Sequence, residues 1–333
     1  VLTPFMPIRD GRDPAQLALA AQQLADGQLV AFATETVYGL GARADDDQAV
    51  ARIFAAKGRP ADHPLIVHVA TLADAQAFGD LSHPAAQRLA QHFWPGALTL
   101  IVPRRPALGT AAAGGQSSIG LRMPSHPVAL ALLQAASALG VPGVAAPSAN
   151  RFGRISPTRA EHVAAEFGTD LLVLDGGPCE LGIESTIVDC SRGAAALLRP
   201  GQIDRVSIES VLGHALHEAG PDAPRASGTL AAHYAPRANL RLLDAGALRS
   251  ALEVLATAPP SKGLAVYSRS VRHAPPGIHL RLMPDQADKV AHELFSVLRG
   301  FDDLGARLIW VETPPPGPAW EGVRDRLTRA AAA

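Results

Sequence analysis

Short apolar segments alternate with helix-like segments along this chain, and the alternation limits the fold to a mixed α/β architecture. Asp13 followed by Pro14 is typical of a helix start, and Gly27 is typical of its end. The apolar run that follows predicts a buried strand over 29–33. The same pattern predicts further strands at 65–69, 98–102, 119–122, 144–146, 171–174 and 186–189. Further helices are predicted at 48–56, 84–93, 127–139 and 159–167.

A second, smaller α/β domain is predicted at the end of the chain, because 333 residues suit two domains of about 100–200 residues. Between 205 and 239 the periodicity loosens, and residues 219–228 are turn formers typical of a linker. Beyond it we predict strands at 240–243, 264–267, 278–282 and 308–311 and helices at 247–256, 286–298 and 320–330. This alternation favours a parallel sheet, and the lack of a G-x-G-x-x-G motif argues against dinucleotide binding.

Composition and charge exclude several classes of protein. Hydrophobic residues make up 47% and charged residues 18%, which is typical of a folded chain rather than a disordered one. A net charge of -1 provides no general attraction to nucleic acid or to an anionic membrane. Cys179 and Cys190 lack the number and spacing of a disulfide framework or a metal site, so we expect two reduced thiols. No apolar run reaches the ~20 residues that span a bilayer, and residues 1–4 lack a signal-peptide pattern, so we expect a cytoplasmic protein.

Five polar or glycine-rich segments fall where predicted strands of the first domain begin or end. They cover 34–41, 57–64, 117–124, 146–158 and 182–189, and Arg199 ends the strand after the last of them. In open α/β sheets, ligands bind beside the carboxyl ends of strands. The five segments therefore predict one ligand site, built from loops that are far apart in the sequence.

The charged residues of these segments suit an anionic ligand, although each has an ordinary structural alternative. Lys57 and Arg59 bracket a glycine and suit a polyphosphate, or they compensate the dipole at a helix end. Arg122 suits a carboxylate, or it is a solvated arginine at a strand edge. The helix predicted from Thr158 suits an anion at its first turn, or Thr158 simply caps it. The chain has no Walker loop, kinase signature or nucleophile elbow.

Taken in order, these segments resemble the threonylcarbamoyl-AMP synthase family, which has the YrdC-like fold. The first motifs that carry the resemblance are Thr-Glu-Thr-Val-Tyr-Gly-Leu-Gly at 34–41, Lys-Gly-Arg-Pro at 57–60, Pro-Leu-Ile-Val-His at 64–68 and Phe-Trp-Pro-Gly-Ala-Leu-Thr at 93–99. The others are Gly-Leu-Arg-Met-Pro at 120–124, Pro-Ser-Ala-Asn at 147–150, Ser-Pro-Thr at 156–158, Glu-Ser-Thr-Ile-Val-Asp at 184–189 and Arg-Pro-Gly at 199–201. His-Tyr-Ala-Pro at 233–236 is similar to the long two-domain form, so the resemblance covers nearly the whole chain.

The resemblance implies three parts of the chain. They are a YrdC-like mixed-sheet domain with a deep cleft at 1–205, a linker that acts as a lid at 206–239, and a small Rossmann-like α/β domain at 240–333. It also implies a nucleotidyltransferase that joins L-threonine, bicarbonate and ATP into threonylcarbamoyl-AMP and releases pyrophosphate. Mg²⁺ would accompany the ATP, and no structural metal is expected. The product would pass to threonylcarbamoyl-transfer proteins that modify tRNA, with weak contact to tRNA itself.

The resemblance also assigns residues by their position in the motifs. Lys57 and Arg59 would be catalytic. The residues expected around threonine are Thr36, His68, Arg122, Ala146 and Ser185. The residues expected around ATP are Lys57, Arg59, His63, Ser118, Ser148, Asn150, Ser156, Arg199 and Tyr234.

Two departures from the family's pattern bear on this site. His63 replaces a common asparagine, so nucleotide affinity is expected to depend on pH near neutrality. His63 and His68 are predicted on opposite faces of one strand, which disfavours a shared metal. The segment 226–232 lacks the family's basic residues, which weakens the case for a direct contact between the linker and phosphate.

Two other functions compete with the synthase. An RNA-binding or ribosome-maturation module could use the same concave surface, but the net charge of -1 and the lack of aromatic-rich basic stretches disfavour it. Carbamoyl-adenylate chemistry of the hydrogenase-maturation type comes with acylphosphatase and zinc-finger modules, which this chain lacks. The synthase is therefore the function that the sequence predicts.

Overall fold

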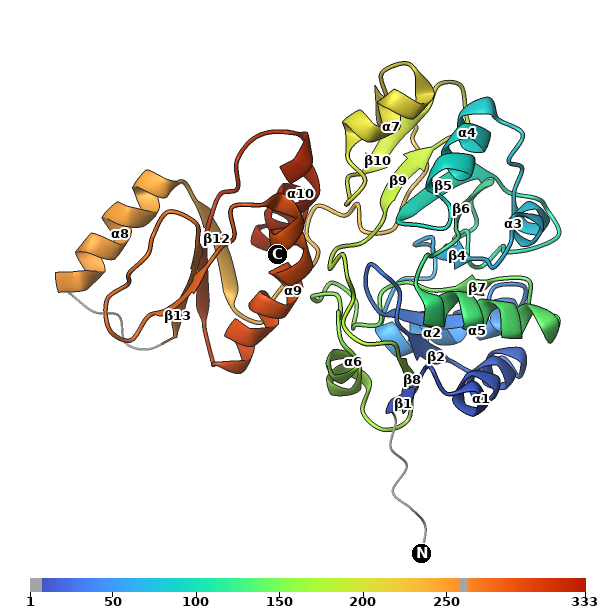
Figure 1. Cartoon of the computed structure of the whole chain (residues 1–333), viewed down its shortest axis with the longest axis horizontal. Helices are drawn as coiled ribbons and strands as arrows, with labels where there is room; N and C mark the ends of the chain where they lie inside the picture. Colours follow the sequence, from blue (N-terminus) through green and yellow to red (C-terminus); the bar gives the residue numbers. More distant parts are fainter. Residues whose placement is uncertain (1–7, 258–262) are drawn as a thin grey trace, which may run out of the picture. The chain divides into compact units, whose positions relative to one another are not determined.

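The computed structural model describes residues 8–257 and 263–333, which form two α/β units (Figure 1). Unit 1 runs to Phe152 and continues from Ser156 to Thr229, whereas unit 2 comprises Gly153–Ile155 and Leu230–Ala333. Residues 1–4, on which the expectation of no signal peptide depends, lie outside the described residues. The domain limits at 205 and 239 stay a prediction.

The helices of unit 1 begin and end mostly where local signals in the sequence predict. Asp13 accepts a hydrogen bond from the Ala15 backbone N–H (2.9 Å) and caps α1, and Gly58 ends α2 with a left-handed φ of 63°. Helices α3 and α7 were not predicted, because α3 is short and α7 buries only two side chains. The helices are α1 (Pro14–Ala25), α2 (Asp47–Lys57), α3 (Leu72–Phe78), α4 (Pro84–Phe93), α5 (Pro127–Ala138), α6 (Ala160–Phe167) and α7 (Arg205–Leu212).

Unit 1 is built on one 11-stranded sheet with the strand order β1-β8-β2-β3-β7-β4-β6-β5-β9-β10-β11. Its strands are β1 (Ile8–Asp10), β2 (Val30–Phe32), β3 (Gly39–Arg43), β4 (Ile66–His68), β5 (Leu98–Pro103), β6 (Ser118–Arg122), β7 (Val144–Ala145), β8 (Leu172–Asp175), β9 (Thr186–Asp189), β10 (Ala196–Arg199) and β11 (His217–Glu218). Strand β4 pairs with β6 in parallel, whereas β5 pairs with β6 antiparallel. The predicted mixed-sheet domain is therefore confirmed.

Strand β3 is the main element that the sequence did not predict, because its two glycines resemble a loop. A Cβ atom at Gly41 would lie 2.8 Å from Cε1 of Phe32 and 2.9 Å from Cγ1 of Val144. Glycine therefore allows β3 to pack between β2 and β7. Most of α7 and all of β11 fall within 206–239, the predicted linker; β11 pairs with β10 at the edge of the sheet.

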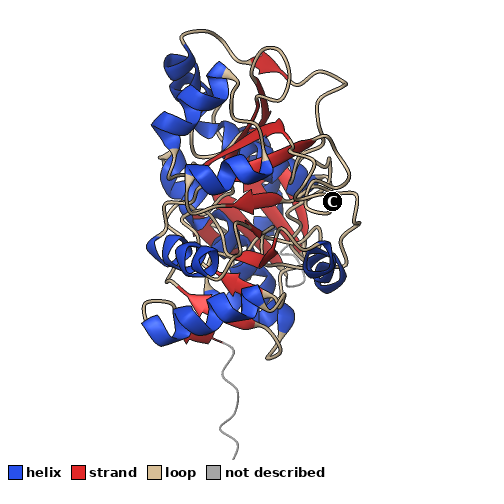
Figure 2. Cartoon of the chain, turned by 90° about the vertical axis from the view of Figure 1, so that its right-hand side faces the viewer, coloured by secondary structure: helices blue, strands red, loops and turns tan. Residues whose placement is uncertain are grey.

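The sheet of unit 1 has an apolar core on each face. Alternate residues of β2 point to opposite faces, so Val30 and Phe32 pack with α1 and α5, while Ala31 packs with the core of α2, α4 and α6. Figure 2 shows strands running through the middle of this unit and helices at its periphery. Cys179 and Cys190 are buried free thiols in the second of these cores, as predicted, and burial raises the pKa of both.

Unit 2 contains a four-stranded parallel sheet with the order β12-β15-β13-β14, which confirms the predicted small parallel α/β domain. Helix α8 lies on one side of this sheet and α9 and α10 on the other (Figure 1). The elements are β12 (Asn239–Leu243), α8 (Ala245–Thr257), β13 (Leu264–Ser268), β14 (His279–Leu282), α9 (Ala287–Asp303), β15 (Leu308–Glu312), a 3₁₀ turn (Pro318–Trp320) and α10 (Glu321–Ala331). Within residues 8–257 and 263–333, every helix is too short or too polar to cross a bilayer.

Candidate active site

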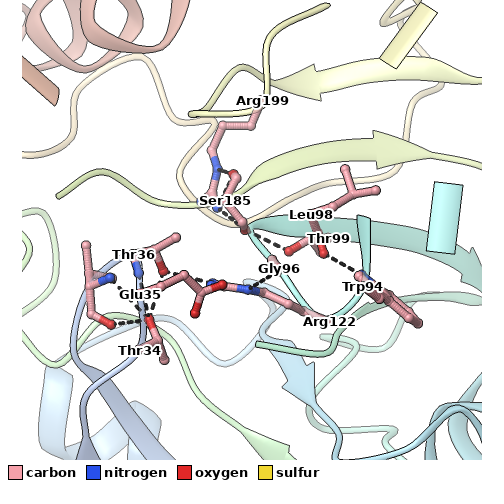
Figure 3. A network of polar contacts seen from close by, with 11 residues as sticks. Thr34, Glu35, Thr36, Trp94, Gly96, Leu98, Thr99, Arg122, Ser185 and Arg199 are labelled. Carbon is pink, nitrogen blue, oxygen red and sulfur yellow. Dashed lines mark hydrogen bonds and ion pairs between the residues drawn. The ribbon is translucent and has the colours of Figure 1, made fainter. Parts of the chain in front are cut away.

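Several predicted site residues meet at the ends of neighbouring strands in unit 1. The parallel pairing of β4 and β6 places His68 directly opposite Arg122. Thr36 follows β2, and Ser185 immediately precedes β9. Figure 3 shows Thr36, Arg122, Ser185 and Arg199 converging from separate elements into one group of polar contacts. These residues from distant loops therefore converge as expected; that they bind a ligand stays a prediction.

Arg122 is a buried, fully oriented cation and only 3% exposed. Its Nη2 lies 2.6 Å from Oε1 of Glu35, its Nη1 donates to Oγ1 of Thr36 (2.9 Å), and its Nε donates to the Gly96 carbonyl (3.2 Å). Burial raises the pKa of Glu35, but the charge and hydrogen bond of Arg122 outweigh burial and hold that pKa below its usual value. The alternative of a solvated arginine at a strand edge is wrong.

The turn that presents Glu35 and Thr36 is held by its own hydroxyl groups. Oγ1 of Thr34 accepts the backbone N–H groups of Thr36 and Val37 (both 3.2 Å) and donates to the Val37 carbonyl (2.6 Å). Such local hydroxyl-to-backbone hydrogen bonds are typical of a tight turn. The segment is therefore both a hydroxyl-capped turn and part of the polar site.

His68 is buried beside Arg122 in an uncharged form. Burial and the charge of Arg122 lower the pKa of His68 to about 3. Its Nδ1 is buried and has no hydrogen-bond partner among the described residues. A neutral imidazole at this position can donate or accept a hydrogen bond to a polar ligand without adding charge.

The buried His68 makes unit 1 sensitive to acid. The unfolded chain binds a proton at this histidine below about pH 6.5, whereas the folded chain does so only near pH 3. We therefore expect the free energy of unfolding to fall as the pH drops through this window, by at most about 1.4 kcal/mol per pH unit from this group. In urea denaturation at about pH 7.5, 6 and 5, His68→Asn should show a shallower pH dependence than the wild type. The exposed His279→Asn is the control and should keep the wild-type slope; equal slopes for His68→Asn and wild type would contradict the prediction.

Lys57 is buried rather than solvated at the end of α2. Its Nζ donates to the backbone carbonyls of Ser148 (2.6 Å) and Asn150 (2.5 Å), so it joins the helix end to the 147–150 loop. Burial and the charge of Arg59 lower the pKa of Lys57 well below its usual value. In its ammonium form Nζ has three N–H donors, and the two carbonyls account for two of them within the described residues. The predicted contact with phosphate would use the third.

Arg59 and Arg199 both contact Ser227. Nη2 of Arg59 lies 3.2 Å from Oγ of Ser227, and Nη1 of Arg199 donates to the Ser227 carbonyl (2.8 Å). Arg199 also donates from Nε and Nη2 to the Ser185 carbonyl (3.1 and 2.9 Å), and Oγ of Ser185 lies 2.8 Å from Oγ1 of Thr99. These contacts connect the two predicted phosphate-binding arginines.

Ser227 belongs to the segment that departs from the family's pattern, and nothing in the sequence predicted its position. Arg225 forms an ion pair with Asp62 (2.7 Å), and the side chain of Ala226 packs against the apolar cluster that includes Ile66. The cavity that this segment lines together with Ser118 and neighbouring strands is small, with only ≈ 10 Å³ open to the centre of a water molecule. The segment 225–227 therefore lies directly against three of the predicted ATP residues, Ser118, Arg59 and Arg199.

The remaining predicted ATP residues differ in their surroundings. His63 lies in the turn before β4, not on the strand as predicted; its ring meets the Phe152 ring edge-on at 5.4 Å. Burial and Arg59 lower the pKa of His63, so the pH dependence expected near neutrality moves to lower pH. Ser156 is buried and its hydroxyl donates to Glu184.

Ala146 and Tyr234 are the last two of the predicted residues. Ala146 contributes its backbone, whose N–H donates to the Ile66 carbonyl (2.9 Å). Tyr234 belongs to unit 2, where its ring stacks on Phe295 at 5.6 Å with the Arg326 guanidinium 5.2 Å away. Its place beside ATP stays a prediction.

Comparison with known proteins gives matches along nearly the whole chain. A family model described as "Telomere recombination" matches residues 22–201, and one described as "Threonylcarbamoyl-AMP synthase, C-terminal domain" matches 203–332. A threonylcarbamoyl-AMP synthase of Pyrococcus abyssi is 36% identical and that of Bacillus subtilis 38% identical. The alignments cover 99% of this chain and 98% of the archaeal protein, and 96% and 93% for the bacterial one.

Two solved structures have similar folds. A variant of P. abyssi Sua5 with a histidine and a tyrosine replaced by alanine superposes with a TM-score of 0.88 at 35% identity, covering 97% of this chain and 96% of that one. P. abyssi Sua5 complexed with L-threonine superposes with a TM-score of 0.85 at 36% identity, covering 95% and 94%. The similarity therefore extends to both units.

Proposed function

The chain belongs to the threonylcarbamoyl-AMP synthase family, and we propose that unit 1 joins L-threonine, bicarbonate and ATP into threonylcarbamoyl-AMP. The observation that supports this most is the adjacency, in one polar region, of the buried cation expected to bind a carboxylate and the buried cations expected to bind phosphate. Arg122 is held by Thr36, and Arg199 is held by Ser185, whose hydroxyl contacts Thr99 on a strand next to β6 (Figure 3). An amino acid and a triphosphate placed there would meet.

The proposed reaction has two bond-forming steps. The amine of threonine attacks the carbon of bicarbonate, and water leaves as the carbamate forms. A carbamate oxygen then attacks the α-phosphorus of ATP, and pyrophosphate leaves. Neither step requires a covalent protein intermediate, so positioning and charge stabilisation carry the rate enhancement. The developing negative charge would be shared by Lys57, Arg59, Arg199 and the magnesium ion that enters with ATP.

We extend the proposal to the use of the product. A mixed anhydride of a carbamate and AMP is an activated acyl donor, so partner proteins would transfer the threonylcarbamoyl group to adenosine in tRNA. On this proposal the protein would act in the cytoplasm. A net charge of -1 does not favour the alternative of an RNA-binding module.

The direct test is the release of pyrophosphate from ATP and magnesium. Release is expected to require both threonine and bicarbonate and to fall by about 10²–10³-fold in Arg59→Ala, because a desolvated phosphate contact is lost. Arg105→Ala, which removes an exposed arginine of the same unit, is the control and should retain wild-type activity. Pyrophosphate release that does not respond to threonine would refute the proposed function.

A further inference from the structure

Glu35 is a buried carboxylate in the polar region for which the proposed reaction has given no task. The residue is 3% exposed, and its Oε1 is paired with Nη2 of Arg122 at 2.6 Å. Its other oxygen, Oε2, is also buried and has no hydrogen-bond partner of good geometry within the described parts of the chain, although the backbone N–H groups of Glu35 and Ser125 lie near enough to the carboxylate to help lower its pKa. A buried carboxylate oxygen without a donor costs free energy. Oε2 is therefore placed to receive a donor from a ligand.

The charges around Glu35 indicate what kind of donor this is. The pKa of Glu35 is raised by burial but lowered further by Arg122, so the carboxylate is anionic at neutral pH. The nearby His68 is neutral, because its pKa is about 3, and burial lowers the pKa of His126 as well. The neighbouring Cys179 thiol is neutral too, because burial raises its pKa. Arg122 is thus the cation of this group, and it is already engaged with Oε1.

Arg122 still has donors for a substrate carboxylate. A guanidinium carries five N–H donors, and three of them bind Glu35, Thr36 and the Gly96 carbonyl. A carboxylate can therefore bind Arg122 without displacing Glu35. In an α-amino acid the ammonium group lies one carbon away from the carboxylate, so it would come close to the Glu35 carboxylate. The Arg122–Glu35 ion pair and a zwitterionic amino acid are complementary in charge when the carboxylate of the amino acid faces Arg122 and its ammonium group faces Glu35.

We propose that Glu35 binds the α-amino group of the amino-acid substrate through Oε2, so that Glu35 and Arg122 together select a zwitterion. This inference rests on the proposed function, because it names the residue that binds the amine, which is the nucleophile of that reaction. Once the ammonium has lost a proton, the amine still donates an N–H to Glu35. Its lone pair then points away from the carboxylate and is available to attack bicarbonate.

The test compares L-threonine with its α-hydroxy analogue, 2,3-dihydroxybutanoate of matching configuration. The analogue keeps the carboxylate and the side-chain hydroxyl but has a hydroxyl in place of the amine. Binding of both is measured by calorimetry with the full-length wild type and Glu35→Gln. Glutamine suits this test because its carbonyl oxygen still accepts the hydrogen bond from Arg122 while the negative charge is removed.

We expect the wild type to bind threonine at least about tenfold more tightly than the analogue, since a charged hydrogen bond is at stake. In Glu35→Gln, threonine affinity should fall by about 10–100-fold and analogue affinity should stay within about threefold, so the preference collapses. Glu35→Asp, which keeps the charge on a shorter side chain, should retain part of the preference. The exposed Glu161→Gln of α6 is the matched control and should keep all of it.

Three results would overturn the inference while leaving the synthase reaction intact. If Glu35→Gln weakens threonine and analogue equally, Glu35 acts only by holding Arg122. If neither affinity changes, the α-amino group binds elsewhere. Should Glu35→Gln fail to fold, Glu35→Asp decides: an undiminished preference for threonine together with a weakened affinity for both ligands would point to a structural role and also overturn it. A wild-type protein that binds no threonine would refute the proposed function and this inference together.

Discussion

Arg122→Met is expected to abolish threonine-dependent pyrophosphate release, with a loss of about 10²–10³-fold in kcat/KM for threonine. The guanidinium is the buried cation that we propose binds the substrate carboxylate, and methionine fills similar volume without charge. The same change removes the partner of Glu35. Leaving one charge of a buried pair uncompensated costs about 3–5 kcal/mol, so the free energy of unfolding should fall by that amount.

A double variant separates the two effects of losing Arg122. Glu35→Gln combined with Arg122→Met removes both buried charges, and it should recover most of the lost stability in urea denaturation. Activity should remain at the level of the single Arg122→Met variant. The exposed Arg105→Met is the control for the loss of an arginine in general. A double variant that is as unstable as Arg122→Met would show that the ion pair is not the source of the loss.

Lys57→Met should lower kcat/KM for ATP by about 10²-fold or more. The KM for ATP should change, whereas the KM for threonine should not. Nζ holds the carbonyls of Ser148 and Asn150, so its removal frees the loop that carries two predicted ATP residues. Stability should change by no more than about 1–2 kcal/mol, because the lost hydrogen bonds are offset by no longer burying an amine.

The measurement for Lys57→Met is steady-state kinetics with each substrate varied in turn. Lys289→Met, which removes an exposed lysine of α9, should behave as the wild type. A rise in the KM for threonine with an unchanged KM for ATP would contradict the prediction, because it would place Lys57 in the amino-acid part of the site. Together with Arg122→Met, this variant tests whether the two halves of the polar region serve different substrates.

Elements with strong local signals were predictable from the sequence alone. Helix α4 occupies Pro84–Phe93, the range that its amphipathic pattern predicts, and the Asp13-Pro14 start of α1 is confirmed by its cap. The motifs also identified the family, since they retain their order along the chain. Strand β3 was missed for a physical reason. A glycine that allows close packing between strands cannot be told apart in the sequence from a glycine in a loop.

The contacts of the site were decided by the tertiary structure. Glu35 and Arg122 are 87 positions apart, and Arg59 and Ser227 are 168 apart, so no local pattern encodes either contact. The order β4-β6-β5-β9 within the sheet places the strand ends side by side. The sequence by itself therefore determined most of the elements, the family and the chemical types of residue in the candidate site. Only the strand order decides which charges pair and which carboxylate oxygen has no donor. The reason is that a buried charge depends on the neighbours that the sheet places beside it.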